Sequence, residues 1–246
     1  MSDLLLFIVI GFAAQLIDGA IGMAYGLASS MVLISMGVPP ATASASVHTA
    51  EIFTTAASAA SHWKAGNVDM RLFRRLVIPG VIGGAAGAYL LTSAPGATIR
   101  PMVAAYLGLM GLVILWRAFN RRYGAAREPK RVEALGLAGG FLDAIGGGGW
   151  GPLVTSSLVG QGAKARHAIG STNAAEFLVT ITISATFVLT IGLELWPIIL
   201  GLVIGGLLAA PFAAYVTRAL PDRPLMILVG LVISLLSIRE LFRALT

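Results

Sequence analysis

Four acidic residues stand in two matched pairs inside long apolar stretches of this 246-residue chain. Asp18 and Glu51 recur as Asp143 and Glu176, each displaced by 125 positions (143 − 18 and 176 − 51). A carboxyl group is costly within a membrane unless it pairs with another group, faces water or takes part in transport. Residues of this type at these positions can carry a proton or bind a cation, or can cap the end of an interrupted helix.

Further residues recur at the same displacement, which indicates a tandem duplication. Gly22, Gly26, Gly37 and Ser46 recur as Gly147, Gly151, Gly162 and Ser171, while Trp150 takes the place of Tyr25 and Asn173 that of His48. A duplicated chain with intramembrane acids is typical of secondary transporters, whose substrate site lies at the interface between the repeats.

The composition places the chain in a membrane. Hydrophobic residues make up 57% of the sequence and charged residues 11%, whereas soluble domains carry about 25% charged residues. Many apolar runs exceed the roughly 18 residues that suggest a membrane span. We therefore expect a multi-pass protein whose surroundings are a lipid bilayer.

The net charge of +6 does not indicate a nucleic-acid partner. No lysine or arginine precedes Lys64, and the densest basic group, between Arg117 and Arg131, separates two apolar stretches. This placement is typical of loops that are retained in the cytoplasm.

Eight apolar segments form two sets of four. They cover about 4–36, 42–62, 72–94, 99–119, 133–160, 167–192, 195–217 and 224–243. We predict a first transmembrane repeat at 1–119, a basic cytoplasmic linker at 120–132 and a second repeat at 133–246, joined as one membrane domain.

The first segment of each set is interrupted by glycine. Asp18-Gly-Ala-Ile-Gly divides the first, and Asp143-Ala-Ile-Gly-Gly-Gly-Gly divides its counterpart. Each half is shorter than the ~20 residues of a spanning helix, and glycine clusters disfavour a continuous helix. Because irregular backbone at membrane depth needs protein or a cavity around it, we predict broken or re-entrant helices.

The loop charges indicate that the two copies lie upside down relative to each other. Wherever a loop of one copy is rich in basic residues, the matching loop of the other is not. In the first copy, the loop between the second and third segments contains Lys64, Arg71, Arg74 and Arg75. In the second copy, the basic loops are the other two, which contain Lys164, Arg166, Arg218 and Arg223. The matching loops of the opposite copy contain only Arg100. Inversion needs an odd number of crossings per copy. The predicted fold is thus an all-α integral membrane protein with two inverted repeats, each a broken or re-entrant first helix plus three spanning helices.

The glycine-rich runs also resemble the sequence pattern of a known protein family. Gly136-Leu-Ala-Gly-Gly-Phe-Leu-Asp-Ala-Ile-Gly-Gly-Gly-Gly-Trp-Gly-Pro152, followed by Gly170-Ser-Thr-Asn173, resembles the signature of the sulfite exporter TauE/SafE family. The run from Asp18 to Gly26 is similar to the N-terminal repeat of one branch of it, although Met23-Ala24-Tyr25 replaces the denser glycine pattern. The resemblance implies export of sulfite or small organosulfonate anions across the bacterial cytoplasmic membrane.

Small oxyanions are held by free backbone N–H groups and by hydroxyl and amide donors. The candidate binding residues lie in the two glycine loops and near the starts of the second and sixth segments: Gly19, Gly22, Gly146, Gly147, Gly148, Gly149, Ser46, His48, Thr49, Ser171, Thr172 and Asn173. For the glycines the alternative is helix packing, and for the acids it is a structural hydrogen bond or cap. His48 with Glu51 is a candidate proton-carrying pair, because a spacing of three places both on one helix face.

Other functions fit the sequence less well. There is no Gly-x-Ser-x-Gly or His-Glu-x-x-His run and no P-loop, so we expect neither an enzyme nor a bound cofactor or metal. The second candidate is a proton- or cation-coupled carrier of another small substrate, with the four acids as its main site. Besides the substrate and the bilayer, a second copy of the chain is a candidate partner.

Overall fold

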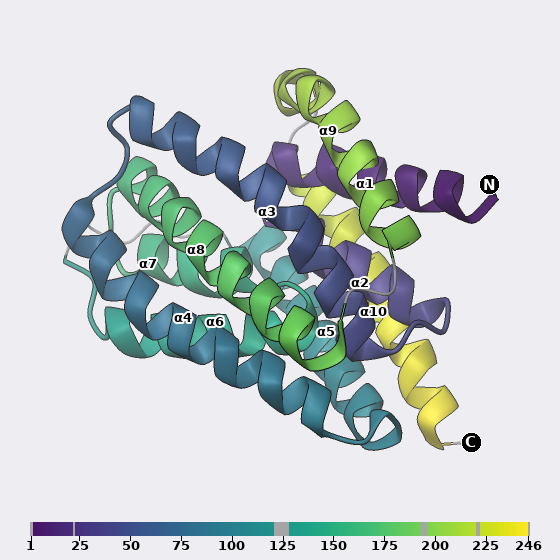
Figure 1. The fold of residues 1–246 in the computed structure, drawn as a ribbon. Coiled ribbons are helices and arrows are strands. Elements are labelled where there is room, and N and C mark those ends of the chain that lie inside the picture. The colour runs from purple at the N-terminus through teal and green to yellow at the C-terminus, as the bar shows by residue number, and fades with distance from the viewer. Residues whose placement is uncertain (1, 22, 121–127, 193–195, 220–221, 246) are drawn as a thin grey trace.

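The computed structural model describes residues 2–21, 23–120, 128–192, 196–219 and 222–245, and these residues form helices and short turns without a strand (Figure 1). The first copy contains α1 (Ser2–Ile21), α2 (Tyr25–Ser35), α3 (Pro40–Lys64), α4 (Met70–Ser93) and α5 (Gly96–Phe119). The second contains α6 (Val132–Gly146), the π-helical turn η1 (Gly151–Thr155), α7 (Ser156–Gly160), α8 (Ala165–Ile191), α9 (Trp196–Ala219) and α10 (Asp222–Leu245). The protein is therefore all-helical, as the sequence predicts.

Among the described residues, four helices are long and apolar enough to cross a membrane: Met70–Ser93, Gly96–Phe119, Ala165–Ile191 and Arg223–Ala244. Large apolar side chains point outward from them, as for Ile78, 63% exposed, and Leu189, 86% exposed. The 25-residue α3 does not belong to this group, since polar residues follow one of its faces. Three spanning helices in each copy thus remain a prediction.

Both first segments are interrupted, but later than the sequence suggests. The helix continues through Asp18 to Ile21 and through Asp143 to Gly146 before the chain turns. The second turn has positive φ at three successive glycines, Gly147 to Gly149 (66°, 151° and 141°), a conformation that other residues rarely adopt. Each aspartate therefore lies in the last turn of the first half-helix and not at the start of the second half.

The two copies pack crosswise, which means that the first helix of each copy packs against a helix of the other. Helix α1 of the first copy lies along α9, and α6 of the second lies along α4. Glycines permit both approaches: a Cβ on Gly11 would meet the Leu202 carbonyl oxygen at 2.6 Å, and one on Gly136 would meet that of Leu76 at 2.8 Å. Gly136 is the counterpart of Gly11, and Leu202 stands 126 positions after Leu76 (202 − 76).

Helices α5 and α10 lie side by side and antiparallel. Arg100 in the first turns of α5 bonds to Glu240 near the end of α10, with Nη2 2.8 Å from Oε2. At the other end of the pair, the Arg223 guanidinium lies 4.7 Å from the centre of the Phe119 ring. Each helix therefore begins where its partner ends.

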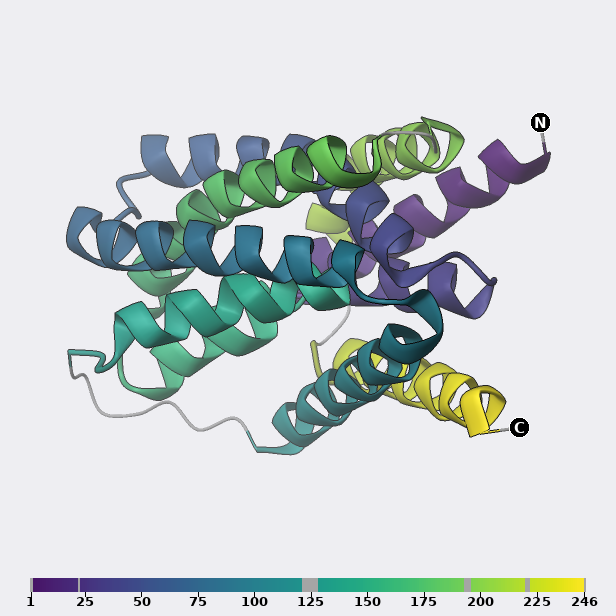
Figure 2. The same cartoon turned by 60° about the horizontal axis from the view of Figure 1, so that its bottom comes forward.

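Basic loops gather at one end of the molecule. The turn after α3 meets the first turns of α8, since Asp69 N donates to Ser171 Oγ (2.9 Å). The start of the second copy joins them, because Lys130 N donates to Gln161 Oε1 (2.8 Å). Both chain ends point away from this group of loops (Figures 1 and 2).

Candidate functional site: a cavity between the broken helices

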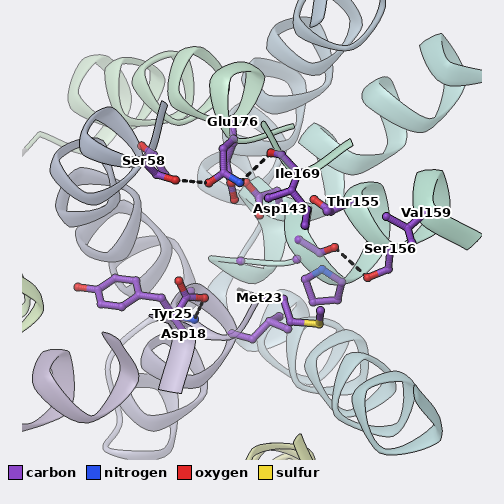
Figure 3. Close-up of a pocket in the computed structure, with 18 of the residues that line it drawn as sticks. Asp18, Met23, Tyr25, Ser58, Asp143, Thr155, Ser156, Val159, Ile169 and Glu176 are labelled. Carbon is purple, nitrogen blue, oxygen red and sulfur yellow. Dashed lines mark hydrogen bonds between the residues drawn. The ribbon is translucent and has the colours of Figure 1, made fainter. Parts of the chain in front are cut away.

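A cavity of about 780 Å³ lies between the two broken helices and is lined by residues of both copies (Figure 3). Its walls come from α1, α2, α3 and α5 of the first copy and from α6, η1, α7 and α8 of the second, with Met226 of α10. All four duplicated acids line it: Asp18, Glu51, Asp143 and Glu176. In the described part of the chain, no three acidic or histidine side chains stand close enough together to hold a metal ion.

The two glycine breaks meet at the cavity. Ser30 Oγ of α2 donates to the Gly147 carbonyl oxygen (2.8 Å). A Cβ on Gly26 would lie 2.7 Å from that same oxygen and 2.8 Å from Glu51 Oε1. Only glycine at position 26 lets the second copy's loop and the Glu51 carboxyl group approach α2 this closely.

Asp18 spans the first break. Its Oδ1 accepts hydrogen bonds from Ala24 N (2.6 Å) and Tyr25 N (3.1 Å), which are free amides at the start of α2. The side chain is partly exposed to the cavity. Asp18 thus has the geometry of a cap that reaches back across the break.

Asp143 spans the second break and also binds a histidine. Its Oδ1 accepts from Trp150 N (2.9 Å), and its Oδ2 lies 3.3 Å from His48 Nε2. The other ring nitrogen of His48 lies 2.9 Å from the Ser44 carbonyl oxygen, while the Ser44 hydroxyl donates to Ala144. Both nitrogens of the fully buried ring therefore lie within hydrogen-bond distance of oxygen atoms, one on its own helix and one on the second copy.

Glu51 lies in α3, and Glu176 lies in the corresponding helix α8. Glu51 is 8% exposed and lines the cavity beside Gly26. In Figure 3, Glu176 stands near Ser58, whose hydroxyl donates to Asn173 Oδ1 (2.8 Å). The expected pairing of His48 with Glu51 is replaced by the bond to Asp143, which the turn of α6 brings to His48.

Three of the candidate binding residues predicted from the sequence line the cavity. These are Gly148, Gly149 and Asn173. Asn173 Nδ2 donates to the Ile169 carbonyl oxygen (2.9 Å), so its amide is held by hydrogen bonds at both ends.

The other predicted binding residues lie behind the cavity wall or at a distance from it. Several bond to helix carbonyls, as Thr49 does with Ala45 (2.7 Å) and Thr172 with Ala168 (2.8 Å). The described residues that do not line the cavity are Ser46, His48, Thr49, Gly146, Gly147, Ser171 and Thr172. Gly19 and Gly22 lie outside the residues whose surroundings the structure describes.

The cavity wall also contains polar residues that were not among the binding residues predicted from the sequence. Thr55, Ser58 and His62 of α3 line it together with Glu51, and Thr155, Ser156 and Ser157 line it from η1 and α7. The spacing of 51, 55, 58 and 62 by three or four residues is a helical polar face, so this signal was present in the sequence. Gln15 of α1 and Arg117 of α5 also line the cavity.

The cavity reaches the surface at the end where the basic loops gather. Its exposed lining residues lie at helix ends there, including Trp116 near the end of α5, Asn120 just after it, and Gly160 and Ala165 around the α7–α8 turn. At the opposite end Arg100 joins α5 to the buried Glu240, and its Nη2 also donates to the Ile34 carbonyl oxygen of α2 (2.8 Å). The exposed lining of the cavity thus lies at the basic end, whereas at the other end an ion pair joins α5 to α10.

Comparisons with known proteins agree with this architecture. The model of the family "Sulfite exporter TauE/SafE" matches residues 7–240. Two Bacillus subtilis (strain 168) proteins are similar. The "Probable membrane transporter protein YtnM" is 41% identical over 251 residues, which cover 98% of this chain and 83% of that protein. The "Probable membrane transporter protein YdhB" is 27% identical over 178 residues, which cover 68% and 72%. No solved structure gives a significant match. The chain therefore belongs to the sulfite exporter TauE/SafE family of multi-pass membrane transporters.

Proposed function

We propose that the protein is a secondary transporter that exports sulfite or small organosulfonate anions across the bacterial cytoplasmic membrane by alternating access. The observation that carries this proposal is the cavity of about 780 Å³ between two broken helices, open at the basic end. Broken helices that face one another at the middle of the membrane form the substrate sites of many secondary transporters. The family's description supplies the substrate class.

The crosswise packing supports two inverted repeats, at 1–119 and 133–246. Gly11 of the first copy contacts Leu202 of the second, and Gly136 of the second contacts Leu76 of the first. The two contacts are therefore related as by a two-fold axis. The corresponding helices α5 and α10 run antiparallel. An axis that relates antiparallel spanning helices lies in the membrane plane, which is the arrangement of inverted-topology repeats.

The basic end is assigned to the cytoplasm by the positive-inside rule. Lys64, Arg71, Lys130 and Lys164 belong to the loops that meet there, with the linker 120–132 among them. The termini then face outward. With the cavity open at the basic end and Arg100 bonded to Glu240 at the other, we assign this structure to an inward-facing state.

A proton-coupled carrier, with the acids as its main site, is the second candidate, and a specific observation favours coupling. Asp143 Oδ2 lies 3.3 Å from His48 Nε2 at the break of the second copy, and the other three acids line the same cavity. Protonation of such acids would offset their cost near a bound anion.

Sulfite efflux from vesicles that contain the purified protein tests both candidates. We expect faster efflux than from protein-free vesicles, and faster still with a pH gradient if protons are coupled. Glu51→Gln should slow efflux, whereas Ser61→Ala, an exposed residue of the same helix, should not. Sulfite efflux no faster than from empty vesicles, with binding of cations only, would support the second candidate instead.

A further inference from the structure

We propose that Arg117, in the last turn of α5, is a residue that binds the transported oxyanion at the cytoplasmic entrance of the cavity. This inference rests on the proposed function and adds a specific contact to it. Arg117 lines the cavity, and within the described part of the chain its Nη1 atom is buried with no hydrogen-bond partner. A buried guanidinium N–H without an acceptor is costly, and an oxyanion would remove that cost.

Retention of the linker in the cytoplasm does not explain this geometry. An arginine that only marks the membrane interface extends its guanidinium group into water. Arg71 has this arrangement, with its side chain 79% exposed beside Glu128. Arg117 instead directs a buried nitrogen to the cavity wall and has no carboxylate within ion-pair distance in the described chain.

The charge distribution in the cavity also favours anion binding at Arg117. Four of its lining residues are acids, and Arg117 is the one arginine or lysine among the described lining residues. The acids lie along α1, α3, α6 and α8, while Arg117 stands beside the exposed Trp116 near the opening. An anion that enters from the cytoplasm therefore meets the guanidinium group before it meets any of the four carboxyl groups.

A second unpartnered polar atom faces the same cavity. Gln15 Oε1 of α1 is buried without a hydrogen-bond partner in the described chain. Half a turn about the terminal torsion of Gln15 presents its NH2 group in place of the oxygen. Ser157 of α7 also lines the wall. Amide and hydroxyl groups are donors that a sulfonate or sulfite can accept in addition to a guanidinium group.

Binding of sulfite and sulfoacetate to the purified full-length protein tests the proposal. Because a hydrogen bond to a charged group is lost, Arg117→Gln should raise the Kd for both anions about 10- to 100-fold. Arg117→Lys should give an intermediate Kd, since an ammonium group keeps the charge but not the bidentate geometry. The control Arg74→Gln removes one charge from the same end at an exposed position and should leave the Kd within about twofold, because exposed charges are screened.

The wild-type protein offers a test that needs no variant. Phenylglyoxal labels accessible arginines, and mass spectrometry measures the label at each site. Saturating sulfoacetate should protect Arg117 severalfold and leave Arg74 unprotected. Equal labelling of Arg117 with and without sulfoacetate overturns the proposal.

The remaining outcomes separate this inference from the proposed function. Export of sulfite with an unchanged Kd in Arg117→Gln overturns the role of Arg117 and leaves the exporter intact. Binding of phosphate or a carboxylate, but of no sulfur oxyanion, that is lost in Arg117→Gln supports the anion site and overturns the substrate class. A wild-type protein that binds only cations overturns both.

Discussion

The two breaks occupy corresponding positions in the duplicated chain, yet their surroundings differ. Asp18 caps α2 with two backbone bonds and is partly exposed to the cavity. Asp143 is 2% exposed and binds both Trp150 N and His48. The difference arises because His48 projects toward Asp143 of the other copy, while its counterpart Asn173 bonds to Ser58. Duplication thus preserved the carboxyl groups but gave a histidine to only one of them.

The backbone conformation and the residue types of the two breaks also differ. The second copy turns on three glycines with positive φ, whereas Met23 and Ala24 stand at the positions of Gly148 and Gly149. Gly148 contacts the backbone of α2 directly. The second break is therefore packed directly against α2 of the first copy, and we expect it to tolerate an added side chain less well than the described residues of the first break do.

The largest expected effect comes from Gly148→Ala. Its Cβ would stand 2.5 Å from the Gly26 carbonyl carbon and 2.7 Å from Gly26 Cα, and its φ of 151° disfavours a side chain. Because the obstacle is backbone, no side-chain rotation relieves it. We expect little folded protein by size-exclusion chromatography and no sulfite efflux.

Met23→Ala is the matched change in the first break. Met23 is partly exposed, so the folded yield of this variant should stay close to that of the wild type. Equal folded yields for the two variants would contradict the view that the second break is packed more tightly.

A smaller effect is expected when the two aspartates are neutralised. Asp18→Asn keeps an oxygen that can accept from Ala24 N and Tyr25 N, whereas Asp143→Asn also replaces the carboxyl oxygen that lies beside the buried His48 ring. The melting temperature in detergent should therefore fall more for Asp143→Asn than for Asp18→Asn. A larger fall for Asp18→Asn would reverse the comparison.

The histidine can be tested in the same series. His48→Asn places the residue of the second copy in the first and removes the partner of Asp143. If the two residues stabilise each other, the double variant Asp143→Asn/His48→Asn should be about 0.5–3 kcal/mol more stable than the sum of the single changes predicts. Strict additivity would show that the 3.3 Å approach contributes nothing.

The sequence predicted the features that depend on local pattern. The recurrence of Asp18 as Asp143 and the glycine runs after them indicated two interrupted helices, and both interruptions occur. Their position was predicted four residues too early, because the helix continues one more turn and the carboxyl group bonds back across the gap. That bond depends on the path of the following chain, which no local propensity encodes.

The contacts between distant segments were beyond a single sequence. The His48–Asp143 bond joins residues 95 positions apart, and the expected partner of His48 was the neighbour on its own helix. Arg117 was read as part of a basic stretch because only the packing of α5 beside the cavity shows that one of its nitrogens is buried. The polar face of α3, in contrast, was available from residue spacing alone.

The smallest expected effects concern the aromatic residue that follows each break. Tyr25 OH donates to the Leu202 carbonyl oxygen, and Trp150 Nε1 to that of Thr172, both at 3.1 Å. Tyr25→Phe removes one hydroxyl group and should cost about 1 kcal/mol, which is a fall of roughly 2–4 °C in melting temperature for a chain of this size. Trp150→Phe removes an equivalent bond and also leaves space where the fully buried indole packs against Gly80 and Gly139, so its fall should be larger. A larger fall for Tyr25→Phe would show that the first break is the rigid one, and the comparison on which the other predictions rest would then be inverted.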